Sequence, residues 1–292
     1  KQTKVVKAEG WGDVADLTWS PDSRWIAFTR LAANQLQQVM LYSLDTSKLI
    51  EATSDRWDSY SPAWTPDGQW LYFLSDRTYE SLVGSIWGSR QPEPFYDGTT
   101  RIYALSLRAK YRSPFAAPDE LEGGADEKPA AKPEKPAAGG AKKPAAAAAS
   151  DDKPAAPATV TIDEAGLQAR LIEVPAGNGN YSTLTTDGKR LWYLDAELGA
   201  DRKQALKSFA IGNDGDEPTT VLADVRTYEL SADRKKILAR KGDGFYVFDA
   251  GAKGPGDLAD AKLPLDGWQL SVTPRIEFGQ MFEESWRLER DY

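Results

Sequence analysis

The chain contains no cysteine and no histidine among its 292 residues. The absence of cysteine excludes disulfide bonds, thiolate metal sites and a cysteine nucleophile. The absence of histidine removes the commonest general base and the commonest zinc ligand. Any chemistry of the Ser-His-Asp type must therefore be completed by residues outside this chain. Carboxylates and Ser-Lys pairs are present but form no catalytic motif, so we predict no catalytic residue, no metal site and no cofactor within the sequence.

Long apolar runs and an excess of positive charge are also missing. No stretch approaches the length of a membrane-spanning helix, and no secretory signal pattern opens the chain, so we expect no membrane contact. The formal net charge is −8 at pH 7. This charge argues against nucleic acid as a partner, because nucleic acid attracts basic surfaces. The sequence begins in a strand-like pattern and ends inside a helical one, so we expect both ends to be cuts in a longer chain.

One ten-residue turn pattern occurs four times. Its copies occupy residues 19–28, 64–73, 184–193 and 230–239. An aspartate stands at the same place in every copy, namely Asp22, Asp67, Asp187 and Asp233. The first pair of aspartates is 45 residues apart and the second pair 46. A repeat of about 40–50 residues built from strands indicates a β-propeller.

Each copy has the chemistry of a hairpin turn. Proline, where present, presets φ for the first corner, aspartate bonds back to the turn backbone, and glycine tolerates a positive φ. In each repeat one apolar, strand-like segment ends at the turn and a second begins directly after it. A third segment follows later in the repeat. A fourth lies before the whole turn pattern and is best seen at 167–174 and 219–222. Four strands per repeat make a propeller blade.

We therefore predict an all-β fold, a β-propeller segment of about four four-stranded blades. The blades are expected at residues 10–54, 55–112, 159–215 and 216–252. In domain terms, residues 1–118 hold blades one and two, and residues 159–273 hold blades three and four. A closing strand is expected from residues 263–265 and 268–272.

Residues 76–100 form an insertion between the second and third strands of blade two. A long loop with its own aromatic residues is often functional. Its candidate contacts for a peptide or a neighbouring domain are Trp87, Arg90 and Glu93. The alternative is a lid packed over a blade edge, and we expect Trp87 and Tyr96 to pack against the propeller.

Residues 119–158 form a second insertion of very different composition. Between residues 128 and 158, Ala, Pro and Lys make up 25 of 31 positions, with no aromatic or branched aliphatic residue. Such a segment buries too little apolar surface to offset its ordering entropy, so we predict a disordered, solvated insertion. We place it between two complete blades.

After Pro274 the hydrophobic period changes from strand-like to helical. Phe278, Phe282 and Trp286 stand four residues apart, and charged residues fill the intervening positions. This spacing predicts an amphipathic helix. We interpret residues 274–292 as the truncated start of a helical domain, the alternative being a closing helix that belongs to the propeller.

Four stretches of the sequence resemble a known family. Residues 90–95 (Arg-Gln-Pro-Glu-Pro-Phe), 100–105 and 112–115 look like the propeller region of bacterial tricorn protease homologues. Residues 281–292, the helical segment, do so more specifically. The turns alone are less specific, because TolB-like, WD-repeat-like and dipeptidyl peptidase propellers share them.

The resemblance implies the latter part of a second propeller and the first helix beyond it, within a large serine peptidase. In that family the propellers are thought to filter or channel peptides to or from the catalytic core. The implied partners are peptide substrates or products and the remaining domains of the parent chain, a PDZ-like module and a peptidase core. A homo-oligomeric parent is also implied. The family's catalytic serine and histidine lie beyond Tyr292, so no catalytic residue is carried over.

Two functions therefore stand as alternatives at this stage. The first is a noncatalytic propeller portion of a tricorn-like serine peptidase. The second is a TolB-like interaction scaffold with no peptidase attached. For the first, we expect a periplasmic or otherwise exported bacterial protein, with a cytoplasmic location as the alternative.

Overall fold

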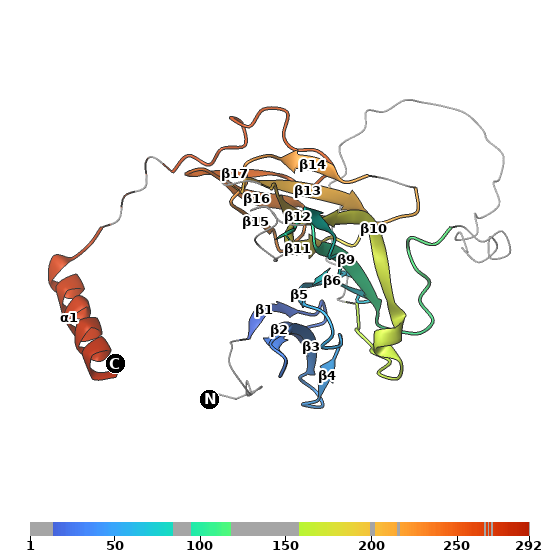
Figure 1. Ribbon diagram of the computed structural model, residues 1–292. Coiled ribbons are helices and arrows are strands. Elements are labelled where there is room, and N and C mark those ends of the chain that lie inside the picture. Colours follow the sequence, from blue (N-terminus) through green and yellow to red (C-terminus); the bar gives the residue numbers. More distant parts are fainter. Residues whose placement is uncertain are drawn as a thin grey trace, which may run out of the picture.

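A computed structural model describes residues 14–83, 95–117, 158–198, 202–214, 217–265, 267, 269 and 271–291. Four antiparallel sheets lie side by side in it, followed by one long helix (Figure 1). Sheet one contains four consecutive strands in sequence order: β1 (Ala15–Trp19), β2 (Trp25–Leu31), β3 (Gln37–Ser43) and β4 (Leu49–Glu51). Each turn pattern joins the first and second strands of a sheet.

The next three sheets repeat this arrangement. Sheet two contains β5 (Ser59–Trp64), β6 (Trp70–Asp76), β9 (Thr100–Ser106) and β10 (Leu171–Gly179). Sheet three contains β11 (Tyr181–Thr186), β12 (Arg190–Ala196), β13 (Gln204–Ala210) and β14 (Thr219–Leu222). Sheet four contains β15 (Thr227–Leu230), β16 (Lys236–Lys241) and β17 (Gly244–Asp249). The predicted fold class, a β-propeller segment of about four blades, is confirmed.

The core consists of three apolar layers between neighbouring sheets. Successive residues of a strand point to opposite faces, and β6 shows the consequence. Leu71 and Phe73 pack towards sheet one, whereas Tyr72 and Leu74 pack towards sheet three. A third layer joins sheets three and four around Trp192. Central strands buried on both faces explain the nearly continuous apolar runs in the sequence.

The second insertion does not lie between two complete blades. Strand β10 pairs with β9, with Leu171 opposite Leu105 and Glu173 opposite Tyr103. The chain therefore leaves sheet two where β9 ends, at Ser106, and returns with β10 to complete it. The prediction that residues 167–174 open blade three was therefore wrong. Part of that segment is a 3₁₀ helix, η1 (Leu167–Arg170). The returning chain already contacts the β9 edge of sheet two before η1, because the Asp163 N–H donates to the Leu107 carbonyl at 2.9 Å.

The blade boundaries shift by one strand for the same reason. Strand β14 is the outer strand of sheet three, not the first strand of blade four as predicted. In sheet four the outer position is taken by a short bridge, in which Lys262 pairs with Tyr246. No closing strand forms among the described residues of 263–272. Leu263 still donates its N–H to the Phe245 carbonyl, but the next residue, Pro264, has no N–H to extend the ladder, which explains why the pairing stops.

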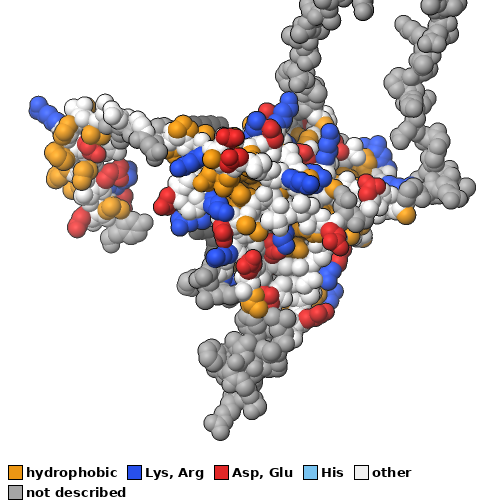
Figure 2. Space-filling view, turned by 90° about the horizontal axis from the view of Figure 1, so that it is seen from above, with side chains coloured by type: hydrophobic (Ala, Val, Ile, Leu, Met, Phe, Trp, Pro, Cys, Tyr) orange, Lys and Arg blue, Asp and Glu red, His pale blue; other side chains and the backbone are white. Residues whose placement is uncertain are grey.

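Helix α1 (Pro274–Asp291) confirms the predicted amphipathic helix. It stands apart from the sheets in Figures 1 and 2, and hydrophobic side chains cover much of its visible surface in Figure 2. Phe278 and Phe282 are 67% and 72% exposed. The helix therefore does not close the propeller. Among the described residues, no helix is long and apolar enough to cross a bilayer.

Candidate functional site

The first strands of the four sheets meet at a common axis. Strands β1, β5, β11 and β15 are the edge strands on that side, and side-chain hydrogen bonds join them in series. The carboxylate of Asp16 accepts the Ser61 N–H at 2.9 Å, and the Ser61 hydroxyl accepts the Leu184 N–H at 2.8 Å. The Tyr228 hydroxyl lies 2.6 Å from the Thr183 carbonyl oxygen. These contacts link sheet one to two, two to three, and three to four.

Three of these edge strands carry a β-bulge where the bonds form. Asp16, Ser61 and Thr183 have φ values of 51°, 53° and 52°, and the register of each strand shifts at that point. A bulge leaves a residue unpaired and redirects backbone and side chain. Here it turns polar groups towards the neighbouring sheet. Strand β15 pairs regularly with β16, and the long side chain of Tyr228 spans the gap instead.

The four repeated aspartates have a structural role. Each Oδ1 accepts the N–H two residues further on, at 3.1 Å for Asp22, 2.9 Å for Asp67, 2.8 Å for Asp187 and 3.1 Å for Asp233. The residue after each aspartate has a positive φ, and that residue is Ser23, Gly68, Gly188 or Arg234. The predicted turn chemistry is confirmed. Each aspartate thus fixes the backbone of its own turn.

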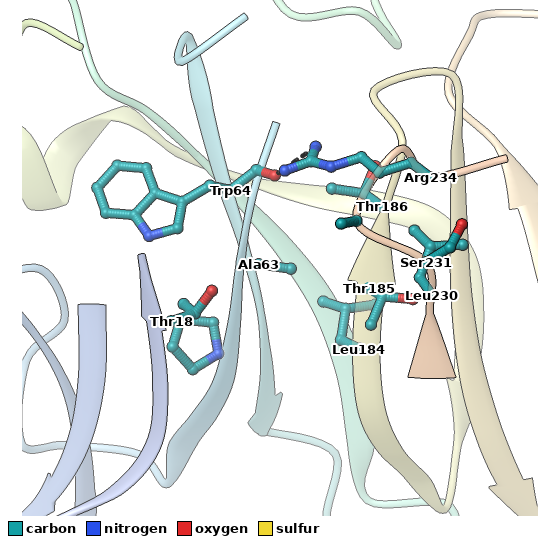
Figure 3. A pocket seen from close by; sticks show the side chains of 11 residues that line it. Thr18, Ala63, Trp64, Leu184, Thr185, Thr186, Leu230, Ser231 and Arg234 are labelled. Atoms are coloured by element: carbon teal, nitrogen blue, oxygen red, sulfur yellow. Dashed lines mark hydrogen bonds between the residues drawn. The ribbon is translucent and has the colours of Figure 1, made fainter. Parts of the chain in front are cut away.

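A pocket of about 290 Å³ lies where these turns surround the axis (Figure 3). Residues from the edge strands of all four sheets line it. They are Thr18, Pro62, Ala63, Trp64, Leu184, Thr185, Thr186 and Leu230, with Ser231, Ala232 and Arg234 of the fourth turn. We call this site the axial pocket. Its wall combines apolar side chains with hydroxyl groups and one guanidinium.

Arg234 is the charged group of the axial pocket. Its side chain extends from the fourth turn towards β5, where Nη1 donates to the Trp64 carbonyl at 3.4 Å (Figure 3). Partial burial lowers the pKa of Arg234 from its usual value, and the carboxylate of Asp187 opposes this shift. The guanidinium remains a cation at neutral pH because its ordinary pKa is so high. The pocket can therefore hold an anionic group beside an apolar wall.

Burial affects the tyrosines of the axis in the opposite direction. Desolvation raises the pKa of Tyr228, with its bond to Thr185 opposing the shift. Desolvation likewise raises the pKa of Tyr181 to about 12. These hydroxyls stay protonated at neutral pH and act as hydrogen-bond donors. In the described part of the chain, no cluster of three or more Asp or Glu side chains is placed to hold a metal ion.

The three site residues predicted from sequence, Trp87, Arg90 and Glu93, lie outside the described residues. The base of their insertion is a short hairpin of β7 (Ser81–Val83) and β8 (Phe95–Tyr96). Tyr79 stacks on Trp57 at 6.1 Å and meets Tyr96 edge-on at 5.6 Å. The insertion thus lies where predicted in sheet two, and aromatic contacts hold its base. Tyr96 itself is 42% exposed.

Sequence reasoning did not identify Arg234 or the bulge residues. One signal for Arg234 was available, because it follows Asp233 at a position where the other copies have Ser23, Gly68 and Gly188. For Asp16 and Ser61 the signal was their separation of 45 residues, which equals the spacing of the first two turns.

Comparison with known proteins agrees with this architecture. Residues 1–251 match the model of the tricorn protease second beta propeller domain. Tricorn protease homolog 1 of Streptomyces coelicolor is 28% identical over 303 residues, which cover 96% of this chain and 25% of that protein. Tricorn protease of Thermoplasma acidophilum is 26% identical over 286 residues, which cover 95% of this chain and 23% of that protein.

A crystal structure of the tricorn protease has the same fold over 94% of this chain and 24% of its own, with a TM-score of 0.67 and 19% identity. The chain spans about a quarter of the length of the curated relatives it matches. The repeated turns, the four sheets around one axis and the match over residues 1–251 lead to one conclusion: the chain belongs to the family of tricorn protease second β-propeller domains.

Proposed function

We propose that this chain is the noncatalytic propeller portion of a tricorn-like serine peptidase and helps to filter or channel peptides to or from a catalytic core outside the chain. The observation that carries this proposal is the axial pocket, which all four sheets line and which no single blade forms alone. A position on the axis is where a propeller can admit or retain an extended chain.

The chemistry of the pocket suits a peptide. Pro62, Leu184 and Leu230 offer apolar contacts, and Thr18 and Arg234 add polar ones. Polar and apolar groups share the surface of this pocket about equally, and an extended peptide presents both kinds of group. A hydrolytic site also needs a base on its nucleophile, and no such pair lines this pocket. The supported role is contact with peptides rather than their cleavage.

The helix supports a place within a larger protein. Its apolar side chains, among them Ile276 and Trp286, are 71% and 56% exposed. We propose that they contact the remaining domains of the parent chain, the PDZ-like module and peptidase core that the resemblance implies.

The proposed function can be tested by narrowing the axial pocket of the full-length protein with a larger side chain. Ala232 lines the pocket and is exposed, so Ala232→Trp fills space without disturbing the core. Ala165→Trp, at another exposed position, is the matched control. We expect the pocket variant to degrade a long unstructured peptide several-fold more slowly, with the control unchanged. Degradation equal to wild type in both variants, with both folded, contradicts the proposed function and favours a scaffold role.

A further inference from the structure

We propose that the axial pocket binds the carboxylate group of a peptide, with Arg234 as its anchor. This inference rests on the proposed function in one respect, because it takes peptides as the ligands. It adds the chemical group that is recognised and the residue that recognises it.

The first observation is the position of Arg234 in its turn. Its φ is 60°, in the left-handed region, where Gly68 and Gly188 stand in two other copies of the turn. A side chain other than glycine is disfavoured in this conformation. A long charged side chain is therefore not required by the turn. An unfavourable conformation retained at a pocket points to a role for the side chain itself.

The second observation is that the donors of Arg234 are hardly used. A guanidinium has five N–H donors, and that of Arg234 makes one hydrogen bond, at 3.4 Å, within the described part of the chain. No described carboxylate lies within 4.0 Å of its guanidinium, and the Asp187 carboxylate is engaged by the N–H groups of Lys189 and Arg190. By contrast, Arg170 donates to four backbone carbonyl groups. Arg170 is a structural cation, whereas Arg234 has donors free for a ligand.

The third observation is the size and wall of the pocket. Its volume of about 290 Å³ is at the small end for ligand sites, so it suits the end of a chain or one side chain. The hydroxyls of Thr185, Thr186 and Ser231 are already hydrogen-bonded to the protein. Arg234 is then the dominant donor for an anion, and guanidinium–carboxylate pairs form strong, frequently bidentate hydrogen bonds. Leu184 and Leu230 line the same pocket and can contact an apolar side chain next to the carboxylate.

Binding of three related fluorescent peptides, measured by anisotropy, tests the proposal. The first ends in leucine with a free carboxylate, the second is its amide, and the third is an amide with one internal glutamate. We expect the free acid to bind about ten-fold or more tightly than the plain amide, the range expected for hydrogen bonds to a charged group. Added salt should reduce this difference, because exposed charges are screened.

Two variants assign the effect to Arg234. Glycine is compatible with this turn, as Gly68 shows at the equivalent position of another copy, so Arg234→Gly should preserve the turn. This variant should abolish the preference for the acid. Arg56→Gly removes an exposed arginine elsewhere and should retain it. Equal binding of acid and amide by the wild type, or a preference that survives Arg234→Gly, overturns the proposal. If the glutamate peptide binds like the acid, and only with Arg234 present, the carboxylate site stands and accepts a side-chain carboxylate as well as a terminal one.

The two proposals fail separately. If Ala232→Trp leaves degradation of long peptides unchanged while the acid preference depends on Arg234, the carboxylate site stands without the channelling function. If degradation slows but acid and amide bind equally, the channelling function stands and the carboxylate site is wrong.

Discussion

Asp16 and Ser61 are 45 residues apart in the sequence and are joined by a 2.9 Å hydrogen bond between the Asp16 carboxylate and the Ser61 N–H. They occupy equivalent β-bulges in two neighbouring edge strands. Residues that lie one sequence repeat apart are thus in direct contact in the fold. Asp16 Oδ2 lies 3.2 Å from the Thr29 hydroxyl as well, so one carboxylate joins two strands of sheet one to sheet two.

Removal of this carboxylate should loosen sheet one. For Asp16→Ala we expect the free energy of unfolding to fall by about 1–2 kcal/mol, because two donors lose a charged acceptor near the surface. Urea unfolding measures this. Asp45→Ala, which breaks an exposed ion pair with Arg24, is the control and should lower the free energy by less than about 1 kcal/mol. Equal falls in the free energy of unfolding for the two variants would show that the contact at the bulge contributes no more to stability than an exposed ion pair.

Tyr228→Phe should destabilise the junction of sheets three and four. Its buried hydroxyl lies 2.6 Å from the Thr183 carbonyl oxygen and 2.7 Å from that of Trp192. Loss of the donor leaves buried acceptors unpaired, at about 1–3 kcal/mol. The control is Tyr72→Phe, because the buried Tyr72 hydroxyl has no hydrogen-bond partner among the described residues. Thermal unfolding should show a lower midpoint for the first variant and an equal or higher one for the second; the reverse order contradicts this account.

Stability should fall at high pH through the buried tyrosines. Burial raises the pKa of Tyr181 to about 12, whereas the unfolded value is about 10. Between these values the unfolded state releases the proton and the folded state keeps it, so the contribution is complete below pH 10 and is lost as pH rises towards 12. The slope for one such group is up to about 1.4 kcal/mol per pH unit. Urea unfolding from pH 9 to 11.5 should therefore show a steeper loss for the wild type than for Tyr181→Phe, and parallel losses would disprove it.

The second insertion should be dispensable for the fold. Replacing residues 119–157 by about twelve Gly and Ser residues should change stability by less than about 1 kcal/mol, because loop-closure entropy varies slowly with length. Cleavage there should leave the two parts associated, since β10 pairs with β9 across the cut. Size-exclusion chromatography after limited proteolysis measures this. Separation of the two parts, or a large loss of stability on shortening, would refute the prediction.

The helix should matter only in the full-length protein. Trp286 is 56% exposed here, so Trp286→Ala should change the stability of this chain by less than about 0.5 kcal/mol. If the remaining domains bury it, the same change should lower the stability of the full-length protein by about 3–5 kcal/mol. Calorimetry of both proteins makes the comparison. A large effect in this chain would show that the helix docks on the propeller.

The sequence alone was sufficient where the determining contacts are local. The bonds of Asp22 and Asp67 lie within their own turns, so turn chemistry predicted them. The partner of β10 was not predictable in this way, because a short apolar strand fits either of two sheet edges. The long insertion also separates β10 from β9 in the sequence, so their pairing leaves no local pattern. The reach of Arg234 to the Trp64 carbonyl depends on how sheet four is rotated about the axis, and no local pattern records that.

The insertion residues Trp87, Arg90 and Glu93 remain predictions. In the described part of their insertion, Tyr79 and Tyr96 meet edge-on at its base. Alanine variants of the three residues in the peptide-binding assay above would test them as contacts.

We propose that this propeller serves a peptidase whose catalytic residues lie elsewhere in the parent protein. Labelling the full-length protein with a fluorophosphonate probe, followed by mass-spectrometric mapping of the modified residue, tests it most directly. We predict one labelled serine outside residues 1–292 and no label within them, because the chain lacks histidine as a general base. A label within residues 1–292, or an active full-length protein without any labelled serine, would contradict the claim.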